Sequence, residues 1–143
     1  MYRKTKLIIV AFFLGLFLFG LNVYAGKSVD WPGFAHGATS LVVLEGKIKS
    51  IDLEKMEIKL EGCDLLGDKP LMLSKDTVCY LGAEDDNIKS IRGGTLFTDE
   101  DKISFNQLKV GHTIKCNYSK KDGKFWAVRI VRIFPHVYRI FIE

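Results

Sequence analysis

The sequence predicts an all-β domain of five or six short strands that close on themselves, and three observations lead to this class. Apolar and polar residues alternate over several short segments between residues 41 and 134, which is the pattern of half-buried strands. Turn residues separate these segments, including an Asp-Gly pair before the last one. The alternation changes phase within two segments, as it does at a β-bulge. Bent strands favour a closed sheet, because closure removes exposed strand edges.

The elements are predicted in order from this alternation. A first strand begins near residue 41, and it carries Val42, Leu44, Gly46 and Ile48 on one face before the phase passes to Ile51 and Leu53. It forms a hairpin with residues 56–61. A third segment covers residues 70–81, with a turn at 74–76. Residues 113–118 and 125–134 form the second hairpin, in which Trp126, Val128 and Ile130 share one face before the phase slips.

Two connecting segments are less regular. Residues 82–102 contain Glu84-Asp85-Asp86 and Asp99-Glu100-Asp101, and we predict a solvated acidic loop here. Residues 103–110 are expected to contain one short helical turn before the fourth strand, closed by Gly111. Together with the two hairpins, these segments make an OB-like barrel the leading topology.

The domain organisation follows from the same patterns. Residues 1–25 read as a secretory signal peptide, because Arg3, Lys4 and Lys6 precede an uncharged run that ends in Val23-Tyr24-Ala25. The alternative is an uncleaved inner-membrane anchor, since the run approaches the length that spans a bilayer. Residues 26–40 form a lead-in arm or linker, 41–134 the barrel, and 135–143 a C-terminal strand or tail. The protein is therefore expected in the periplasm or outside the cell.

The charge and the cysteines limit the function classes. The net charge of +4 lies mostly in residues 1–25, so the mature chain is nearly neutral, which argues against a phosphate-neutralising nucleic-acid binder. The outward residues of the second strand, Glu57, Lys59 and Glu61, also offer no stacking platform. Cys116 alternates with buried residues, whereas Cys63 and Cys79 either form a disulfide or remain free thiols.

Four segments carry a resemblance to a known class. LEGKIKSID (44–52), MEIKL (56–60), LKVGHTIKC (108–116) and AVRI (127–130) resemble small exported bacterial OB-like domains of unknown function. His112 stands where that pattern usually has Asp. The chain also has a weaker similarity to the periplasmic copper-binding barrels of metal efflux systems. Those barrels hold Cu(I) with His, an M-x-M pair and Trp, whereas here Met72 stands alone between two leucines.

No catalytic or cofactor motif accompanies these strands. The serines lie outside any G-x-S-x-G context, and His36, His112 and His136 are too dispersed for a metal-site spacing. The acidic triplets lack the loop pattern of a calcium site and read as solubilising residues. We therefore expect no enzyme and no cofactor, but a binding or interaction module for an unknown protein or small ligand. The alternative is a periplasmic metal or small-ligand carrier.

Large apolar side chains outside the barrel pattern are the predicted interaction surface. They lie in the lead-in and in the tail, and leaving them in water costs free energy. The tail either adds a sixth strand or offers an edge to a partner. The residues concerned are Trp31, Phe34, Tyr138, Ile140, Phe141 and Ile142. Contact with a membrane is expected only through an uncleaved signal segment.

The mature protein should begin at Gly26, because the cationic head, the apolar run and the V-x-A ending occur in the order that signal peptidase reads. Mass spectrometry of the exported protein measures its N-terminus directly. Recovery of the intact chain in the membrane fraction would show that residues 1–25 are an anchor instead.

Overall fold

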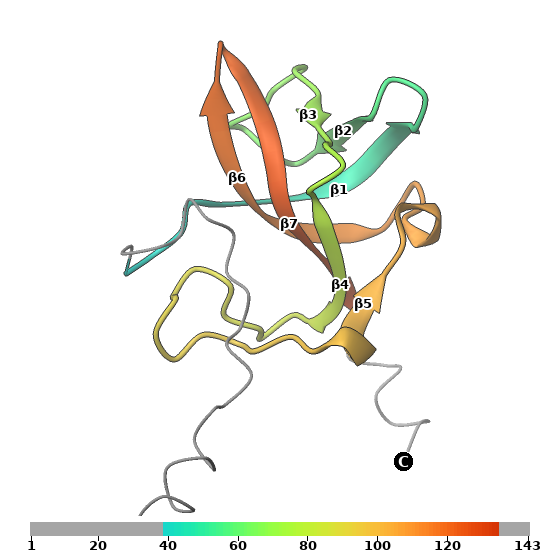
Figure 1. The fold of residues 1–143 in the computed structure, drawn as a ribbon. Helices are drawn as coiled ribbons and strands as arrows, with labels where there is room; N and C mark the ends of the chain where they lie inside the picture. Colours follow the sequence, from blue (N-terminus) through green and yellow to red (C-terminus); the bar gives the residue numbers. More distant parts are fainter. Residues whose placement is uncertain (1–38, 135–143) are drawn as a thin grey trace, which may run out of the picture. The chain divides into compact units, whose positions relative to one another are not determined.

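The computed structural model describes residues 39–134, which lie within one compact unit of the chain, Trp31–Glu143. The predicted signal peptide, nearly all of the lead-in and the tail fall outside the described residues. The predicted all-β class is confirmed, and the described part contains seven strands and no α-helix (Figure 1). The strands are β1 (Val43–Asp52), β2 (Glu57–Glu61), β3 (Leu71–Met72), β4 (Val78–Ala83), β5 (Lys102–Ile103), β6 (Thr113–Lys121) and β7 (Lys124–Phe134).

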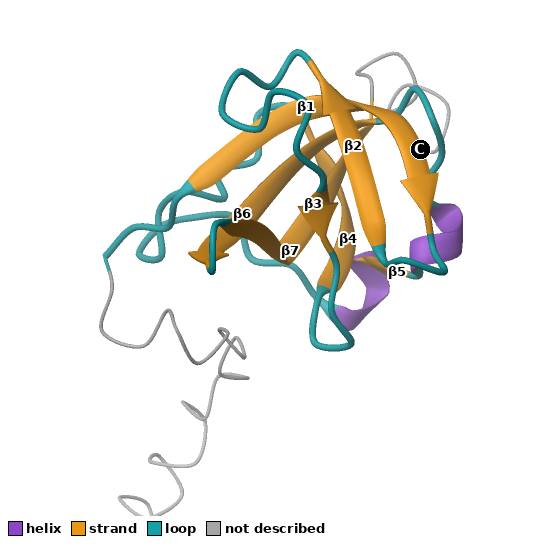
Figure 2. Ribbon diagram, turned by 90° about the horizontal axis from the view of Figure 1, so that it is seen from above, coloured by secondary structure: helices purple, strands orange, loops and turns teal. Residues whose placement is uncertain are grey.

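The strand pairings form a ring. Neighbours pair in the order β3-β2-β1-β6-β7-β4-β5, and a further pairing joins β3 to β7. The β1–β2, β2–β3, β1–β6 and β6–β7 pairs are antiparallel, whereas β3 and β4 both run parallel to β7. Starting at β1, the pairings lead through β2, β3, β7 and β6 back to β1. Figure 2 shows these strands curving around one another, with β5 and the short helices to one side.

The core lies on the inner side of these strands. Leu44 and Ile48 of β1 are buried there as predicted, and so are Ile58 and Leu60 of β2. Val42 and Leu53 were expected on the same side, but 60% and 41% of their surfaces are exposed. Val42 precedes β1 and Leu53 follows it, so neither is held in the alternation of the strand. The remaining members of the core are Cys63, Leu66, Leu71, Leu73, Cys79, Leu108, Ile114, Cys116, Phe125, Ala127 and Ile130.

Both predicted phase slips correspond to irregularities in strand pairing. In β1, Ile48 pairs with Leu60 and Ser50 with Lys59, so Lys49 is the extra residue of a bulge. In β7, the register shifts opposite the Asn117–Tyr118 step, and the extra residue is Val128. The insertion at Val128 changes the face predicted for the residues of β7 that precede it.

The bulge in β7 changes which side chains reach the core. Phe125, Ala127 and Ile130 are buried there, whereas Trp126 and Val128 lie on the opposite face of the strand and are only partly buried. The predicted common face of Trp126, Val128 and Ile130 is therefore wrong. Because the extra residue is Val128, the side chains change face two residues before Ile130, where the sequence pattern had placed the change.

The second hairpin is tighter than predicted. β6 extends to Lys121 and β7 begins at Lys124, so only Asp122 and Gly123 make the turn. Both have positive φ, 53° and 74°, as in a type I′ turn whose twist matches that of the flanking strands. The Asp-Gly pair predicted as the turn signal is confirmed.

The segment between β4 and β6 is mostly exposed loop, as its acidic residues predicted, but it is also anchored to the sheet. Ile88 is 2% exposed, and β5 pairs with β4. Asn117 Nδ2 and Arg129 Nη2 both donate to the carbonyl of Ile88, at 3.0 and 3.2 Å. Arg129 Nε also donates to Asn117 Oδ1 at 2.8 Å. The segment is thus fixed to β6 and β7 by buried hydrogen bonds, which its own composition could not reveal.

The expected helical turn before the fourth strand of the ring is not confirmed as an α-helical turn. Residues 103–110 contain one three-residue 3-10 helix, η3 (Phe105–Gln107), and a similar helix, η2 (Asp99–Asp101), precedes it. Gly111 does not cap η3. Its φ of 90° belongs to the next turn, and its N–H donates to the carbonyl of Ile48 in β1.

A buried hydroxyl supports the parallel seam between β3, β4 and β7. Thr77, 6% exposed, donates from Oγ1 to the carbonyl of Ala127 in β7 at 2.7 Å. The same oxygen accepts from the N–H of Ser74 at 2.9 Å. Thr77 therefore joins the β3–β4 turn to β7.

Thr77→Val should lower the free energy of unfolding by about 1–3 kcal/mol, because it leaves the buried N–H and carbonyl without this partner. Urea denaturation followed by circular dichroism measures the change. Thr113→Val in β6 is the matched control, and it should change stability by no more than about 0.5 kcal/mol. Equal losses in the two variants would contradict the role given to the Thr77 hydroxyl.

Candidate functional site

A groove of about 400 Å³ lies on the outer side of β1 and β2. Most of its lining residues carry a polar or charged group, whereas the larger part of the lining surface is apolar. The lining residues are Lys49, Ser50, Lys59, Leu60, Gly67 and Asp68. Its volume is in the range of small-molecule sites, although such sites are usually lined by apolar side chains. A groove of this composition suits a small, polar and charged ligand.

The bulge in β1 builds one wall of this groove. In a regular strand, successive side chains point to opposite faces, so Lys49 and Ser50 would be separated by the sheet. Because Lys49 is the extra residue of the bulge, both side chains are exposed on the outer side. Ser50 is directly opposite Lys59 in β2, which is also exposed. The bulge in β1 therefore places Lys49, Ser50 and Lys59 on the same side of the β1–β2 pair.

The loop after β2 supplies the other wall. Its two turns are held by hydrogen bonds from the N–H groups of Leu66 and Gly67 to the carbonyl of Cys63, at 3.2 and 3.1 Å. Leu66 is buried in the core and anchors the loop to it. Gly67 has a φ of 53°, a conformation that favours glycine. This turn presents Asp68 to the groove.

Ion pairs flank the groove but do not use its lysines. Lys47 Nζ lies 3.7 Å from Glu61 Oε1, and Lys55 Nζ lies 3.5 Å from Asp52 Oδ2. The N–H of Lys55, followed by its ammonium group, lowers the pKa of Asp52. Within residues 39–134, the structure records no ion pair for Lys49 or Lys59. These two ammonium groups and the carboxylate of Asp68 give the groove a local charge of about +1 at neutral pH.

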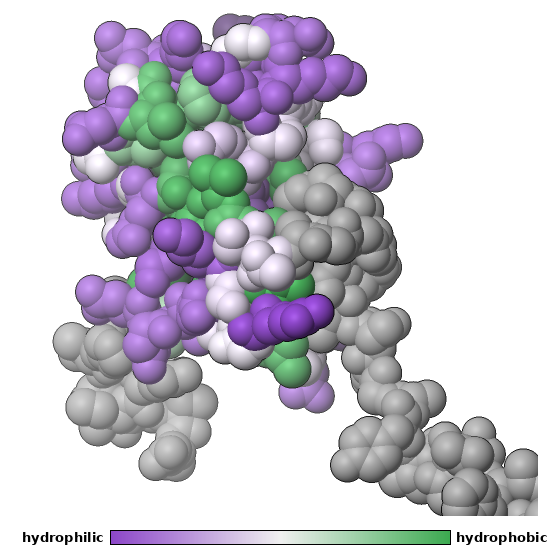
Figure 3. All heavy atoms as spheres, turned by 90° about the vertical axis from the view of Figure 1, so that its left-hand side faces the viewer, coloured by the Kyte–Doolittle hydropathy of each residue, from purple (hydrophilic) through white to green (hydrophobic). Residues whose placement is uncertain are grey.

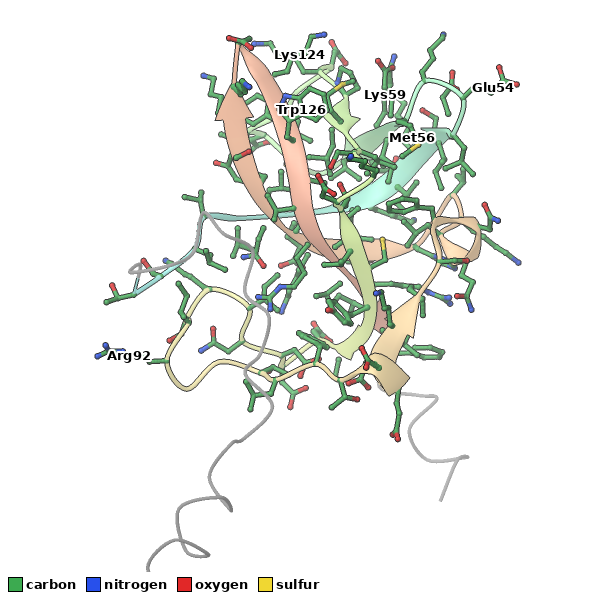
Figure 4. All side chains as sticks on the ribbon, viewed as in Figure 1. Glu54, Met56, Lys59, Arg92, Lys124 and Trp126 are labelled. Carbon is green, nitrogen blue, oxygen red and sulfur yellow. The ribbon has the colours of Figure 1, made fainter. Side chains whose placement is uncertain are left out.

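One tryptophan and one methionine lie side by side on the neighbouring strands. Trp126 of β7 pairs in register with Met72 of β3, and both side chains are partly buried on the outer side of the sheet. Lys121 and Lys124 flank the hairpin turn on exposed positions. Figure 4 shows Lys59, Lys124 and Trp126 at the same end of the molecule. In Figure 3 most side chains at that end are hydrophilic, with a hydrophobic patch among them.

The structure gives local roles to the other predicted candidates. Asp86 accepts from the N–H of Ala83 at 2.6 Å, and Asp101 accepts from the N–H of Thr98 at 2.8 Å. His112 Nδ1 accepts from the N–H of Lys109 at 3.0 Å. Burial, followed by the charges of Arg132 and Lys109, lowers the pKa of His112. Residues 39–134 contain no group of three or more His, Cys, Asp or Glu that could hold a metal ion.

The three cysteines are free thiols in the core. The predicted alternative of a Cys63–Cys79 disulfide is therefore not found. Cys63 lies beside β1, where a Cβ on Gly46 would be 3.2 Å from its own Cβ, whereas Cys79 pairs with Ile130 of β7. Burial raises the pKa of Cys79 to about 12 and also raises that of Cys116. Neither Cys79 nor Cys116 is suited to nucleophilic chemistry, which requires the thiolate.

Several predicted residues lie outside the described part of the chain. They are Trp31, Phe34, His36, His136, Tyr138, Ile140, Phe141 and Ile142. The groove, in contrast, was missed by the sequence analysis. The phase slip at residue 49 was its one visible signal, because an inserted residue in a strand redirects a side chain.

Cys79 and Cys116 should react very slowly with an aromatic disulfide reagent at about pH 8. A pKa of about 12 leaves roughly one Cys79 thiol in ten thousand ionised. Absorbance of the released thiolate, with peptide mass spectrometry to locate the label, measures this. Protein in urea is the control, in which all three cysteines should react within minutes. Fast labelling of either residue in the native protein would contradict the buried placement.

Comparison of the chain with protein-family models, with curated proteins and with solved structures found no significant match. In the described range 39–134, no helix has the length and apolar character needed to cross a membrane.

Proposed function

We propose that this protein is a non-enzymatic binding module built on an OB-like barrel and exported from the cytoplasm. The order of strand pairings supports the barrel. Three antiparallel strands (β1, β2, β3) are followed by a hairpin (β6, β7) that pairs with β1 on one side and runs parallel to β3 on the other. A five-stranded, partly open barrel has this connectivity in the OB fold. The pattern of residues 1–25 supports export.

The outer face that carries the groove is the observation on which the binding role rests. Barrels of this class bind ligands on the face of their second and third strands and with neighbouring hairpin loops. Here Lys59 of β2, Met72 of β3 and Trp126 of β7 lie on the outer side of the sheet, with Glu57 of β2 directly opposite Met72 and Trp126 in register beyond it. A partly buried indole offers a flat apolar surface, and the lysines attract negative charge. The face therefore suits a ligand with both a flat apolar part and an anionic part.

The same face bears on the expectation about nucleic acid. The strand-two residues are charged, as predicted, and offer no stacking platform. Trp126 supplies one aromatic surface from β7, on the face opposite to Ile130 and not on the shared face that the sequence predicted. We propose a small anionic ligand as the partner, since one aromatic ring serves a single planar group. An oligonucleotide is included in the test below. A small-ligand carrier is the second candidate, and the volume of the groove favours it.

Ligand binding at this face should change the fluorescence of Trp126. In a Trp31→Phe protein, Trp126 is the single tryptophan of the chain. We expect a saturable change with at least one of three probes: inorganic phosphate, an anionic oligosaccharide or a thymidine oligonucleotide. For a ring-containing probe, Trp126→Ala should weaken binding, measured by calorimetry, by about tenfold or more through loss of stacking.

Two controls accompany this measurement. Trp126→Phe keeps an aromatic ring and should retain most of the affinity. Val128→Ala alters the same face of β7 two residues from Trp126 and should have little effect. Saturable binding of the oligonucleotide alone would identify nucleic acid as the partner and overturn the small-ligand proposal. Absence of a change with all three probes would overturn the binding role of this face.

A further inference from the structure

We propose that the β1–β2 groove binds a phosphate group carried on a small hydroxylated molecule. This inference rests on the proposed function and goes beyond it, because it names the chemistry of the ligand and the atoms that hold it. Lys49 and Lys59 contact the phosphate oxygens, Ser50 donates a hydrogen bond to it, and Asp68 accepts a hydrogen bond from a hydroxyl of the ligand. All four residues line the groove.

The arrangement of charges selects an oxyanion. Ser50 and Lys59 are direct partners across the β1–β2 pair, and Lys49 precedes Ser50 at the bulge. Side chains at directly opposed positions have Cβ atoms about 5 Å apart, so one phosphate group can be reached from both strands. Ammonium groups bind phosphate as point charges, without the planar geometry that a guanidinium prefers. Three donors around one small space match the several acceptor oxygens of a phosphate.

The neighbouring ion pairs make this arrangement specific to the groove. Lys47 lies on the same side of β1, but Glu61 compensates its charge at 3.7 Å. In the described range, no carboxylate pairs with Lys49 or Lys59 in this way. Lys49 and Lys59 are thus the groove lysines without an ion pair in the described range, with Glu57 and Glu61 on the same face of β2 as Lys59.

Asp68 determines what else the ligand carries. Asp68 lines the same groove as the two lysines, and an ionised carboxylate repels any anion placed beside it. A ligand that presented only negative charge would gain from the lysines and lose at Asp68. A hydroxyl group on the ligand turns that position into a hydrogen bond, since an ionised carboxylate is an acceptor only. The groove therefore favours a phosphate ester of a polyol or sugar over free phosphate.

Titrations of the ¹⁵N-labelled mature protein with inorganic phosphate and with glycerol phosphate test the proposal. The amide signals of Ser50, Lys59 and Gly67 should shift in a saturable way, and those of the distant Gly93 should not. Glycerol phosphate should bind more tightly than inorganic phosphate. Lys49→Gln and Lys59→Gln should each weaken binding by about fivefold, the upper range for an exposed ion pair.

Two further variants separate specific binding from general attraction. Lys47→Gln removes a lysine from the same face outside the groove, and it should change the affinity by less than about twofold. Asp68→Asn should strengthen the binding of inorganic phosphate, because it removes the repulsion. The same substitution should reduce or abolish the preference for glycerol phosphate. Circular dichroism of each variant confirms that it folds, which exposed positions are expected to allow.

The source of the phosphate group is distinguished by a third titration. Vesicles of phosphatidylglycerol mixed with phosphatidylcholine present the same group on a lipid, and pure phosphatidylcholine vesicles are their control. Binding to the mixed vesicles that Lys49→Gln weakens identifies a headgroup, whereas binding of glycerol phosphate alone identifies a soluble ligand. Equal effects of Lys47→Gln and Lys49→Gln, or shifts outside the groove, would overturn the proposal. In that case a fluorescence response of Trp126 to another probe would leave the proposed function intact.

Discussion

The parallel pairing of β7 with β3 and β4 is the constraint on which the rest of the structure depends. β7 is the longest described strand, and it pairs with β6 on one side and with β3 and β4 on the other. Without the contact to β3, the pairings would form an open sheet with a free edge at β3, and such an edge is open to pairing with other chains. With it, Leu71 of β3 and Phe125 of β7 become register partners in the same core.

Closure of this ring requires strands that bend, and the bulges supply the bend. Each bulge also changes what one strand presents to solvent. The extra residue in β1, Lys49, places a lysine and a serine together on the outer side. The extra residue in β7, Val128, places Phe125 inside and Trp126 outside. The same two irregularities therefore shape the core and determine the chemistry of the outer face, so the candidate site cannot be separated from the curvature of the sheet.

The sequence predicted the local features well because they depend on local rules. Alternation of period two marked both hairpins, the phase slips marked both bulges, and Asp122-Gly123 marked the type I′ turn. It failed where the outcome depends on distant contacts. The acidic segment after β4 contains Ile88. Its anchoring depends on Arg129, 41 residues away in the sequence, which donates to the Ile88 carbonyl. The composition of the segment does not predict that contact. The face of Trp126 was misassigned because the slip alone does not say which residue is the insertion.

The candidate site shows the same limit. Lys49, Ser50 and Lys59 were visible as polar residues of two adjacent strands, but their convergence requires the register, in which Ser50 and not Lys49 is opposite Lys59. Asp68 comes from a loop whose path is set by the burial of Leu66 and the turn at Gly67. Three independent elements thus meet at the groove.

Within residues 39–134, the buried groups are less suited to binding a ligand than those of the outer face. Two of the thiols, Cys79 and Cys116, are kept protonated by burial, and the guanidinium of Arg129 is committed to buried hydrogen bonds that fix the acidic segment. Burial of a charged group is costly unless hydrogen bonds compensate it, so a change at Arg129 would be felt first as lost stability. The proposed binding role therefore rests on the outer face, where the charged groups remain solvated and a ligand can replace their water.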